Sequence, residues 1–205
     1  MRRIVLIGSG GHGRSVIDSI ESAGEYEIAG FVGPESCSYR GYRTLGDDGD
    51  LVRLRKEGIE CAFVGLGYLG SGTRRQELFA LLCDIGYEIP PVVDPSAILA
   101  AGVSIGAGAY VGKGAIINAG ATVGDMAIVN TNAVVEHDCV VESFSHVSVS
   151  ATLCGSVSVG EASFVGAAAT VCQGLSIGKH ALVGANSTVL RSVADGLRVV
   201  GVYNG

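Results

Sequence analysis

Several residue types that dominate other protein classes are scarce in this chain of 205 residues. Tryptophan is absent, proline occurs 4 times, and charged residues make up 17% of the chain. The few prolines exclude a Pro-rich disordered protein, and the 32 glycines have no three-residue period, which excludes collagen. The formal net charge is −6, so no broad positive field exists to hold the phosphates of a nucleic acid.

Long hydrophobic runs are also missing, although 48% of the residues are hydrophobic. Glycine, serine, asparagine and aspartate interrupt every stretch before it reaches the ~18 apolar residues that a membrane span needs. The apolar run after Arg2 and Arg3 ends at Gly8, which is too short for a secretory signal peptide. We therefore expect a soluble, cytoplasmic protein with a buried core and no membrane insertion.

Six cysteines are present, and none has the C-x-x-C spacing that is typical of zinc or redox sites. In a cytoplasmic chain, such cysteines are usually small buried hydrophobic residues. We therefore expect no metal site and no disulfides. The six are Cys37, Cys61, Cys83, Cys139, Cys154 and Cys172.

The second half of the chain contains an internal repeat with a period of six. Every sixth residue from Ile105 to Val189 is Val, Ile or Leu, which makes fifteen positions in succession. Such a period predicts a solenoid, in which each repeat forms one short strand and three repeats complete a triangular coil. The inward aliphatic side chains then stack into one core. An ordinary β-sandwich is disfavoured, because its strands would recur irregularly, about every 8 to 12 residues.

Glycine or asparagine often follows the repeated aliphatic residue. Both residue types tolerate left-handed backbone angles, so we expect them to adopt such angles at the corners of the coils. The positions are Gly106, Gly112, Asn118, Gly124, Asn130, Gly160, Gly166, Gly178 and Gly184.

The distribution of charge divides the chain. Residues 1–96 carry 24 of the 34 charged side chains, whereas residues 97–190 carry seven. Because the repeat ends near residue 190, we predict an N-terminal domain at 1–96, a repeat domain at 97–190 and a C-terminal tail at 191–205.

The N-terminal half alternates between short apolar runs and helical patterns. This alternation predicts a small parallel α/β sheet. The expected strands are residues 3–7, 26–32 and 61–65, and the expected helices are residues 14–22, about 50–56 and 73–85.

A glycine-rich turn, GSGGHG at residues 8–13, follows the first predicted strand and precedes a helix. Backbone N–H groups and the helix dipole favour a phosphate at such a turn, which predicts that Gly10, Gly11 and His12 bind a phosphate-bearing ligand. A dinucleotide-binding fold needs an acidic residue at the end of its second strand to bind a ribose. Here that strand ends in VGP, and Glu35 comes just beyond it, so NAD is disfavoured. A purely structural tight turn is the alternative.

The histidines are candidate proton carriers. His137 occupies an outward-facing position of the repeat and precedes Asp138, whose carboxylate can orient and polarise the ring. The pair is therefore a candidate catalytic dyad, and an exposed corner histidine is the alternative. His146 is expected on an adjoining face of the same coil, and His180 is expected to be an exposed turn residue.

Two motifs, combined with the repeat, resemble one family over nearly the whole chain. They are the GSGGHG turn and residues 129–148, VNTNAVVEHDCVVESFSHVS. The family is the sialic acid O-acetyltransferase and nucleotide-4-amino-sugar N-acetyltransferase group of hexapeptide-repeat proteins. The resemblance implies an α/β Rossmann-like N-terminal domain followed by an all-β left-handed parallel β-helix.

The resemblance also implies roles for residues of the EHD and FSHVS motifs. His137 would be the general base with Asp138 as its partner, and His146 would lie by the acetyl-CoA thioester. The backbone N–H of Gly155 would hold the acetyl carbonyl oxygen. Further residues are assigned by the same resemblance: Gly166 and Gly184 to acetyl-CoA, Asn118 and Asn130 to the sugar pocket, and Glu35 with the glycine turn to the nucleotide.

The predicted activity is acetyl-CoA-dependent N-acetylation of a nucleotide-linked 4-amino-4,6-dideoxy sugar, by direct transfer and with no metal. Family members are trimers with acetyl-CoA between neighbouring β-helices, so the resemblance implies a homotrimer. One alternative is O-acetylation of a sialic acid or related hydroxyl, because an amine and a hydroxyl need the same base. Another is a non-catalytic nucleotide-sugar scaffold, which would not need His137, Asp138 and Gly155.

Overall fold

A four-stranded parallel sheet, in the order β3-β2-β1-β4, forms the first part of the computed structural model. The structure describes residues 1–34, 39–68 and 72–205. The alternating α/β pattern is confirmed, and a short strand that the sequence did not reveal, β3, extends the sheet. The elements are β1 (Arg2–Ile7), α1 (Gly11–Ala23), β2 (Tyr26–Val32), β3 (Thr44–Gly46), η1 (Asp48–Asp50), α2 (Leu51–Lys56), β4 (Cys61–Val64) and α3 (Thr73–Ile85).

Helix α1 begins at Gly11, three residues earlier than expected. A Cβ at Gly13 would lie 2.7 Å from the Gly8 carbonyl oxygen, so glycine lets the first turn of the helix pack directly on the end of β1. Val16, Ile17 and Ile20 form its buried face. The second half of the glycine-rich turn, residues 11–13, is therefore the first turn of the helix.

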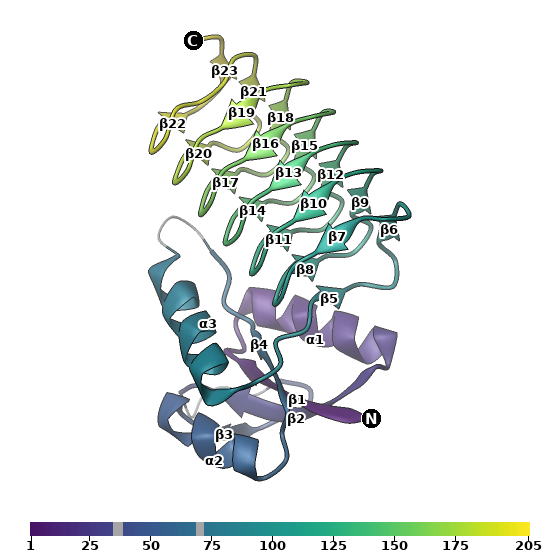
Figure 1. Cartoon of the computed structure of the whole chain (residues 1–205), viewed down its shortest axis with the longest axis vertical. Helices are drawn as coiled ribbons and strands as arrows, with labels where there is room; N and C mark the ends of the chain where they lie inside the picture. The colour runs from purple at the N-terminus through teal and green to yellow at the C-terminus, as the bar shows by residue number, and fades with distance from the viewer. Residues whose placement is uncertain (35–38, 69–71) are drawn as a thin grey trace.

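Three parallel sheets form the rest of the molecule, a left-handed β-helix that extends away from the N-terminal domain (Figure 1). We name each sheet after its first strand. The β5 face contains β5 (Val92–Val93), β8 (Tyr110–Val111), β11 (Ile128–Val129), β14 (His146–Val147), β17 (Phe164–Val165), β20 (Leu182–Val183) and β22 (Arg198–Val199). The β6 face contains β6 (Ile98–Leu99), β9 (Ile116–Ile117), β12 (Val134–Val135), β15 (Thr152–Leu153), β18 (Thr170–Val171), β21 (Thr188–Val189) and β23 (Val202–Tyr203). The β7 face contains β7 (Ser104–Ile105), β10 (Thr122–Val123), β13 (Val140–Val141), β16 (Ser158–Val159) and β19 (Ser176–Ile177).

The core of the β-helix consists of the repeated aliphatic residues and the small residues two positions before them. From Val111 to Val189, every aliphatic residue of the repeat is at most 2% exposed. Equivalent residues pair in register every eighteen residues, for example Val135 with Leu153. The predicted triangular coil of three repeats is confirmed.

The expected role of the hexad glycines was wrong. Left-handed angles occur three residues after the aliphatic residue, at positions such as Asn132 (φ 54°) and Asp138 (φ 59°), and not directly after it. The glycines directly after it face the backbone of the next coil: a Cβ at Gly166 would lie 2.5 Å from Ala185 N, and one at Gly160 would lie 2.7 Å from Lys179 N. Glycine is needed there for the close approach of successive coils.

The ends of the β-helix extend beyond the repeat seen in the sequence. Strand β5 pairs with β8, and β22 and β23 pair with β20 and β21. Part of the predicted tail, residues 191–205, therefore continues the ladder, with Val199 buried inside the last coil.

The N-terminal domain packs on the first coils of the β5 face. Outward residues of this face, Tyr110 and Ile128, join the cluster that contains Val16 and Ile17 of α1. No helix among the described residues is long and apolar enough to cross a membrane.

A buried carboxylate lies at this junction. The side chain of Asp94 is 2% exposed and accepts hydrogen bonds from Ser19 Oγ (2.6 Å), Ser96 Oγ (2.6 Å) and Lys113 Nζ (3.0 Å). Burial opposes its ionisation, but these donors outweigh burial and hold the pKa of Asp94 well below its usual range. Asp94 thus connects helix α1 to the first coil.

Candidate active site

His137 and Asp138 lie at an exposed corner between β12 and β13. His137 Nδ1 is 2.9 Å from Asp138 Oδ2. Because a carboxylate only accepts, Nδ1 carries the proton that it donates, and this tautomer leaves the basic lone pair of the ring on Nε2. The left-handed backbone at Asp138 lets these consecutive side chains meet. The geometry is that of an oriented general base.

Gly155 lies directly against the His137 ring in the next coil. A Cβ at this position would be 2.4 Å from His137 Nε2 and 2.6 Å from its Cε1, so any side chain would displace the ring. Among the described residues, no group accepts a hydrogen bond from the Gly155 N–H. A free donor thus lies beside a free base, which is the pairing that acyl transfer needs.

Glu136 holds the backbone of the same corner. Its Oε1 accepts from Asn118 Nδ2 at 2.9 Å, and its Oε2 accepts from the His137 N–H at 3.1 Å. Asn118 is thereby placed one coil from His137, where its predicted role in the sugar pocket remains a prediction. No role for Glu136 was predicted, although its position next to His137 is visible in the EHD motif.

His146 lies on the β5 face, away from this corner. Its Nδ1 donates to the Tyr68 carbonyl oxygen (3.1 Å), and its Nε2 accepts from Asn130 Nδ2 (3.2 Å). Burial lowers the pKa of His146 to about 4, so the ring is neutral near pH 7. With both nitrogens occupied, the ring anchors the loop after β4 to the β-helix.

A cavity of about 500 Å³ opens where this loop meets the glycine-rich turn. It brings together five of the predicted residues, namely Gly10, Gly11, His12, Asn130 and His146. Among the described residues, its lining is Gly10, Gly11, His12, Gly65, Leu66, Gly67, Tyr68, Asn130, His146 and Ser148, which include no carboxylate. We call it the turn cavity. His137, Asp138, Gly155 and Asn118 do not line it, so a single chain separates the predicted residues into two groups.

His12 is the second residue of α1, and its ring packs edge-to-face on Tyr110 at 5.1 Å. Burial lowers the pKa of His12 to about 3, and its Nε2 has no hydrogen-bond partner in the described part of the chain. His12 lines the turn cavity as a neutral imidazole whose Nε2 is buried.

Gly166 and Gly184 lie on the corner after the β5 face, in the same row as Asn130. A Cβ at Gly184 would lie 2.8 Å from Val200 Cγ1, and one at Gly166 would lie 2.5 Å from Ala185 N. Coil packing thus accounts for both glycines, and their predicted contact with acetyl-CoA remains a prediction.

A second cavity, of about 570 Å³, lies at the carboxyl ends of β2 and β3. Gly33, Pro34, Asp47, Asp48 and Arg74 line it. Parallel sheets bind ligands at this edge, next to the turn after the first strand. The predicted nucleotide residue Glu35 follows Pro34 but lies outside the described residues.

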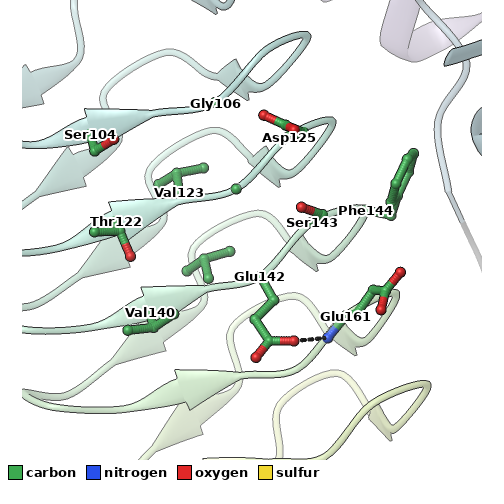
Figure 2. A pocket seen from close by; sticks show the side chains of 12 residues that line it. Ser104, Gly106, Thr122, Val123, Asp125, Val140, Glu142, Ser143, Phe144 and Glu161 are labelled. Carbon is green, nitrogen blue, oxygen red and sulfur yellow. Dashed lines mark hydrogen bonds between the residues drawn. The ribbon is translucent and has the colours of Figure 1, made fainter. Parts of the chain in front are cut away.

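Figure 2 shows a third cavity, of about 590 Å³, on the β7 face. Carboxylates line it, but two of them have structural partners: Asp125 accepts from the Ala107 N–H at 2.8 Å, and Glu142 accepts from the Glu161 N–H at 3.0 Å. These contacts connect successive coils. The described residues contain no group of three or more His, Cys, Asp or Glu that could hold a metal ion, and their cysteines are free thiols.

Comparisons with known proteins identify the family to which the chain belongs. A family model of the PglD N-terminal domain matches residues 3–80, and a model of the hexapeptide repeat of succinyl-transferase matches residues 102–137 and 156–191. A variant of perosamine N-acetyltransferase from Caulobacter crescentus, solved with CoA and GDP-perosamine, is 36% identical and covers 98% of this chain and 94% of its own, with a TM-score of 0.92. The chain belongs to the family of PglD-type acetyltransferases.

Two further solved structures are similar to the chain, one of them in fold alone. The acetyltransferase domain of PglB from Neisseria gonorrhoeae, in complex with acetyl coenzyme A, is 31% identical to this PglD-type acetyltransferase. That match covers 98% of this chain and 96% of the other, with a TM-score of 0.91. WeeI from Acinetobacter baumannii is 21% identical, covers 98% of this chain and 97% of its own, and shares the fold with a TM-score of 0.81. A search of curated proteins found no match.

Proposed function

We propose that this PglD-type acetyltransferase moves the acetyl group of acetyl-CoA to the 4-amino group of a nucleotide-linked 4-amino-4,6-dideoxy sugar. Relatives that are more than 30% identical were solved with CoA and GDP-perosamine or with acetyl coenzyme A, which supports the donor and the acceptor class. The observation that carries the proposal is the free lone pair of His137 Nε2 beside the uncommitted Gly155 N–H.

His137 acts as the general base in this proposal. The amine nitrogen attacks the thioester carbonyl carbon while Nε2 removes one of its protons, and the carbonyl oxygen takes the new negative charge. The Gly155 N–H stabilises that oxygen. Collapse of the intermediate breaks the C–S bond, and the CoA sulfur leaves with a proton from the imidazolium. Asp138 keeps the ring oriented and stabilises its charged form.

The two domains divide the binding of substrates. We propose that residues 1–96 hold the nucleotide, with the diphosphate at Gly10 and Gly11 and the nucleoside towards the second cavity. The β-helix, residues 97–190, would carry the acetyl-CoA arm along the corners that contain Gly155, Gly166 and Gly184. The tail, residues 191–205, would complete the last coils beside CoA.

The turn cavity and His137 lie on different sides of one chain, which favours an active site that two chains share. The turn cavity lies on the β5 face, whereas His137 occupies the corner between the β6 and β7 faces. We propose a homotrimer in which the turn cavity of one chain presents the sugar to His137 of its neighbour. Closed cyclic symmetry would repeat this contact three times.

A thiol-release assay tests the proposed activity. Purified protein is incubated with acetyl-CoA and GDP-, UDP- or dTDP-linked 4-amino sugars, with free sialic acids as the hydroxyl controls. Thiol release and an N-acetylated product are expected with at least one nucleotide amino sugar. Release with sialic acid alone would assign the protein to O-acetylation, and tight nucleotide binding without any transfer would favour a scaffold.

A further inference from the structure

Two cysteines occupy successive coils of the β-helix, in the row of residues that directly follow the strands of the β6 face. Cys154 follows β15, and Cys172 follows β18. They are eighteen residues apart, so they hold the same position in their coils. Both are free thiols of intermediate exposure, and the proposed function uses neither. We call this row the cysteine row; from Asn118 onwards it contains Asn118, Glu136, Cys154, Cys172 and Leu190.

The register of the strands brings the two thiols within reach of each other. Leu153 pairs with Val171, and the Cys154 N–H donates to the Val171 carbonyl oxygen at 3.0 Å. Neighbouring strands lie about 4.8 Å apart, a separation of Cα atoms that a disulfide can bridge. Burial raises the pKa of the Cys154 thiol, and the charge of Cys172 raises it further, which agrees with this proximity.

Other side chains of the cysteine row meet across coils. Asn118 Nδ2 donates to Glu136 Oε1 at 2.9 Å, and these two residues are also eighteen positions apart. Cys154 and Cys172 repeat the same relation two coils further along, with no residue of the row between them. The fold therefore presents the two cysteines to each other as a pair.

The pair adjoins the candidate active site. Cys154 directly precedes Gly155, which lies against the His137 ring. Residues paired in register keep their Cβ atoms near the strand spacing of about 4.8 Å, whereas a disulfide holds its Cβ atoms about 3.8 Å apart. A bridge therefore requires a shift of about 1 Å in a coil beside Gly155. A misplacement of that size at a reacting centre can lower the rate by about 10².

We propose that Cys154 and Cys172 form an oxidisable thiol pair, which a hydroperoxide converts to a disulfide that displaces the Gly155 N–H and slows acetyl transfer. This inference rests on the proposed function in one respect, the role of that N–H. The strain in the bridge makes it easy to reduce, so thiols reverse the modification.

The oxidation proceeds in two steps. The raised pKa of Cys154 disfavours its thiolate, so Cys172 is the expected first target. The Cys172 thiolate attacks one peroxide oxygen, the O–O bond breaks, and water leaves with a proton from solvent, which gives a sulfenic acid. The Cys154 thiolate then attacks the sulfenic sulfur, the S–S bond forms, and the S–O bond breaks to release the second water. Two thiols thus lose two electrons, and the peroxide is reduced to two waters.

A purely structural role for the two cysteines makes the opposite prediction. If they only fill the row as small residues, peroxide would leave them unlinked and would not alter turnover through them. Cys172→Ser separates the two roles, because it removes one thiol and lies a full coil away from Gly155. Cys83→Ser is the matched control, because Cys83 is an exposed thiol on α3.

The experiment treats the protein with hydrogen peroxide, blocks the remaining thiols and cleaves the chain after glutamate. Glu142 and Glu161 flank Cys154, so its fragment, residues 143–161, is separate from residues 162–205, which contain Cys172. We expect these fragments to be joined in the oxidised wild type and separate after dithiothreitol. Turnover should fall at least tenfold on oxidation and recover on reduction. Reduced Cys172→Ser should match the reduced wild type and lose no turnover to peroxide.

The controls make the result decisive. Cys83→Ser should respond to peroxide as the wild type does, and Cys154→Ser replaces Cys172→Ser if the latter does not fold. Three outcomes would overturn the inference: unlinked fragments under conditions that oxidise Cys83, joined fragments with unchanged turnover, and an equal loss of turnover in Cys172→Ser.

Acetyl transfer by the reduced wild type is measured separately. Transfer without joined fragments rejects the thiol pair alone. Joined fragments in a protein that transfers no acetyl group to any acceptor reject the proposed function alone.

Discussion

Two regions of the β-helix, an exposed corner and the face that packs against the N-terminal domain, use histidine in opposite ways. In the β-helix corner, His137 is exposed, has one nitrogen bound to Asp138 and keeps the other free. At the boundary between the domains, His146 is buried and both of its nitrogens are occupied. The repeat requires aliphatic or small residues at the inward positions of each coil, whereas the residues at the outward corners are free to vary. A group that transfers protons therefore fits at a corner of this fold.

The β-helix and the N-terminal half also differ in how many charged side chains they carry. Residues 97–190 carry few charges because one uninterrupted aliphatic core holds their coils together. The N-terminal half carries most of the charge. Among its described residues, two charged side chains are buried, Asp94 and Arg75, and both lie where it meets the β-helix. Asp94 accepts hydrogen bonds from four donor groups, whereas Arg75 donates one, to the Met126 carbonyl oxygen. The hydrogen bonds that Asp94 accepts compensate its buried charge and stabilise the junction of the two regions.

Removal of the exposed histidine should have the largest effect. We expect His137→Ala to lower turnover by about 10² or more while binding of acetyl-CoA stays intact, because only the base is lost. His180→Ala is the control, since His180 is another exposed corner histidine. Near wild-type turnover in His137→Ala would reject the role of the base.

A smaller effect is expected from a change in coil packing. Gly160→Ala should lower the free energy of unfolding by about 1 to 3 kcal/mol, because its Cβ would meet the backbone of the next coil. Gly174→Asn is the control: its φ is 69°, and Asn132 and Asn186 occupy equivalent corners, so a change within about 0.5 kcal/mol is expected. Urea unfolding measures both variants, and an equal loss of unfolding free energy in Gly160→Ala and Gly174→Asn would contradict the packing explanation.

The smallest effect concerns the junction of the two regions. Asp94 has a lowered pKa in the folded protein, so its contribution is present above its unfolded value of about 4 and decreases as the pH falls below it. Asp94→Asn should cost about 1 to 2 kcal/mol at pH 7 and less at pH 3.5. Urea unfolding across this range checks the sign, and a pH-independent difference would contradict it.

The β-helix could be predicted almost entirely from the sequence, because its inward positions recur with a fixed period that no tertiary contact alters. The backbone conformation at the corners of the coils was harder to predict. Glycines such as Gly166 suggested left-handed angles, but they serve the close approach of coils, which becomes visible only when the next coil is in place. The three-residue strand β3 has no pattern of its own and forms because β2 offers a free edge.

The site was predictable in its parts and not in its arrangement. The EHD motif placed His137 beside Asp138, and the structure places these side chains within hydrogen-bond distance. Nothing in the sequence placed His146 against Tyr68 or Arg75 against the Met126 carbonyl oxygen, because both contacts depend on the packing of the N-terminal domain on the β-helix.

A subunit-complementation assay tests the central claim, that the turn cavity of one chain works with His137 of another. Gly11→Glu places a carboxylate at the proposed diphosphate site. The start of α1 has room for this side chain, but its negative charge would repel a diphosphate. His137→Ala and Gly11→Glu should each be inactive as homo-oligomers. After unfolding and refolding together in equal amounts, random assembly should restore about a quarter of wild-type turnover, because a site needs one intact partner of each kind. No recovery from mixed oligomers would show that each chain forms its site alone.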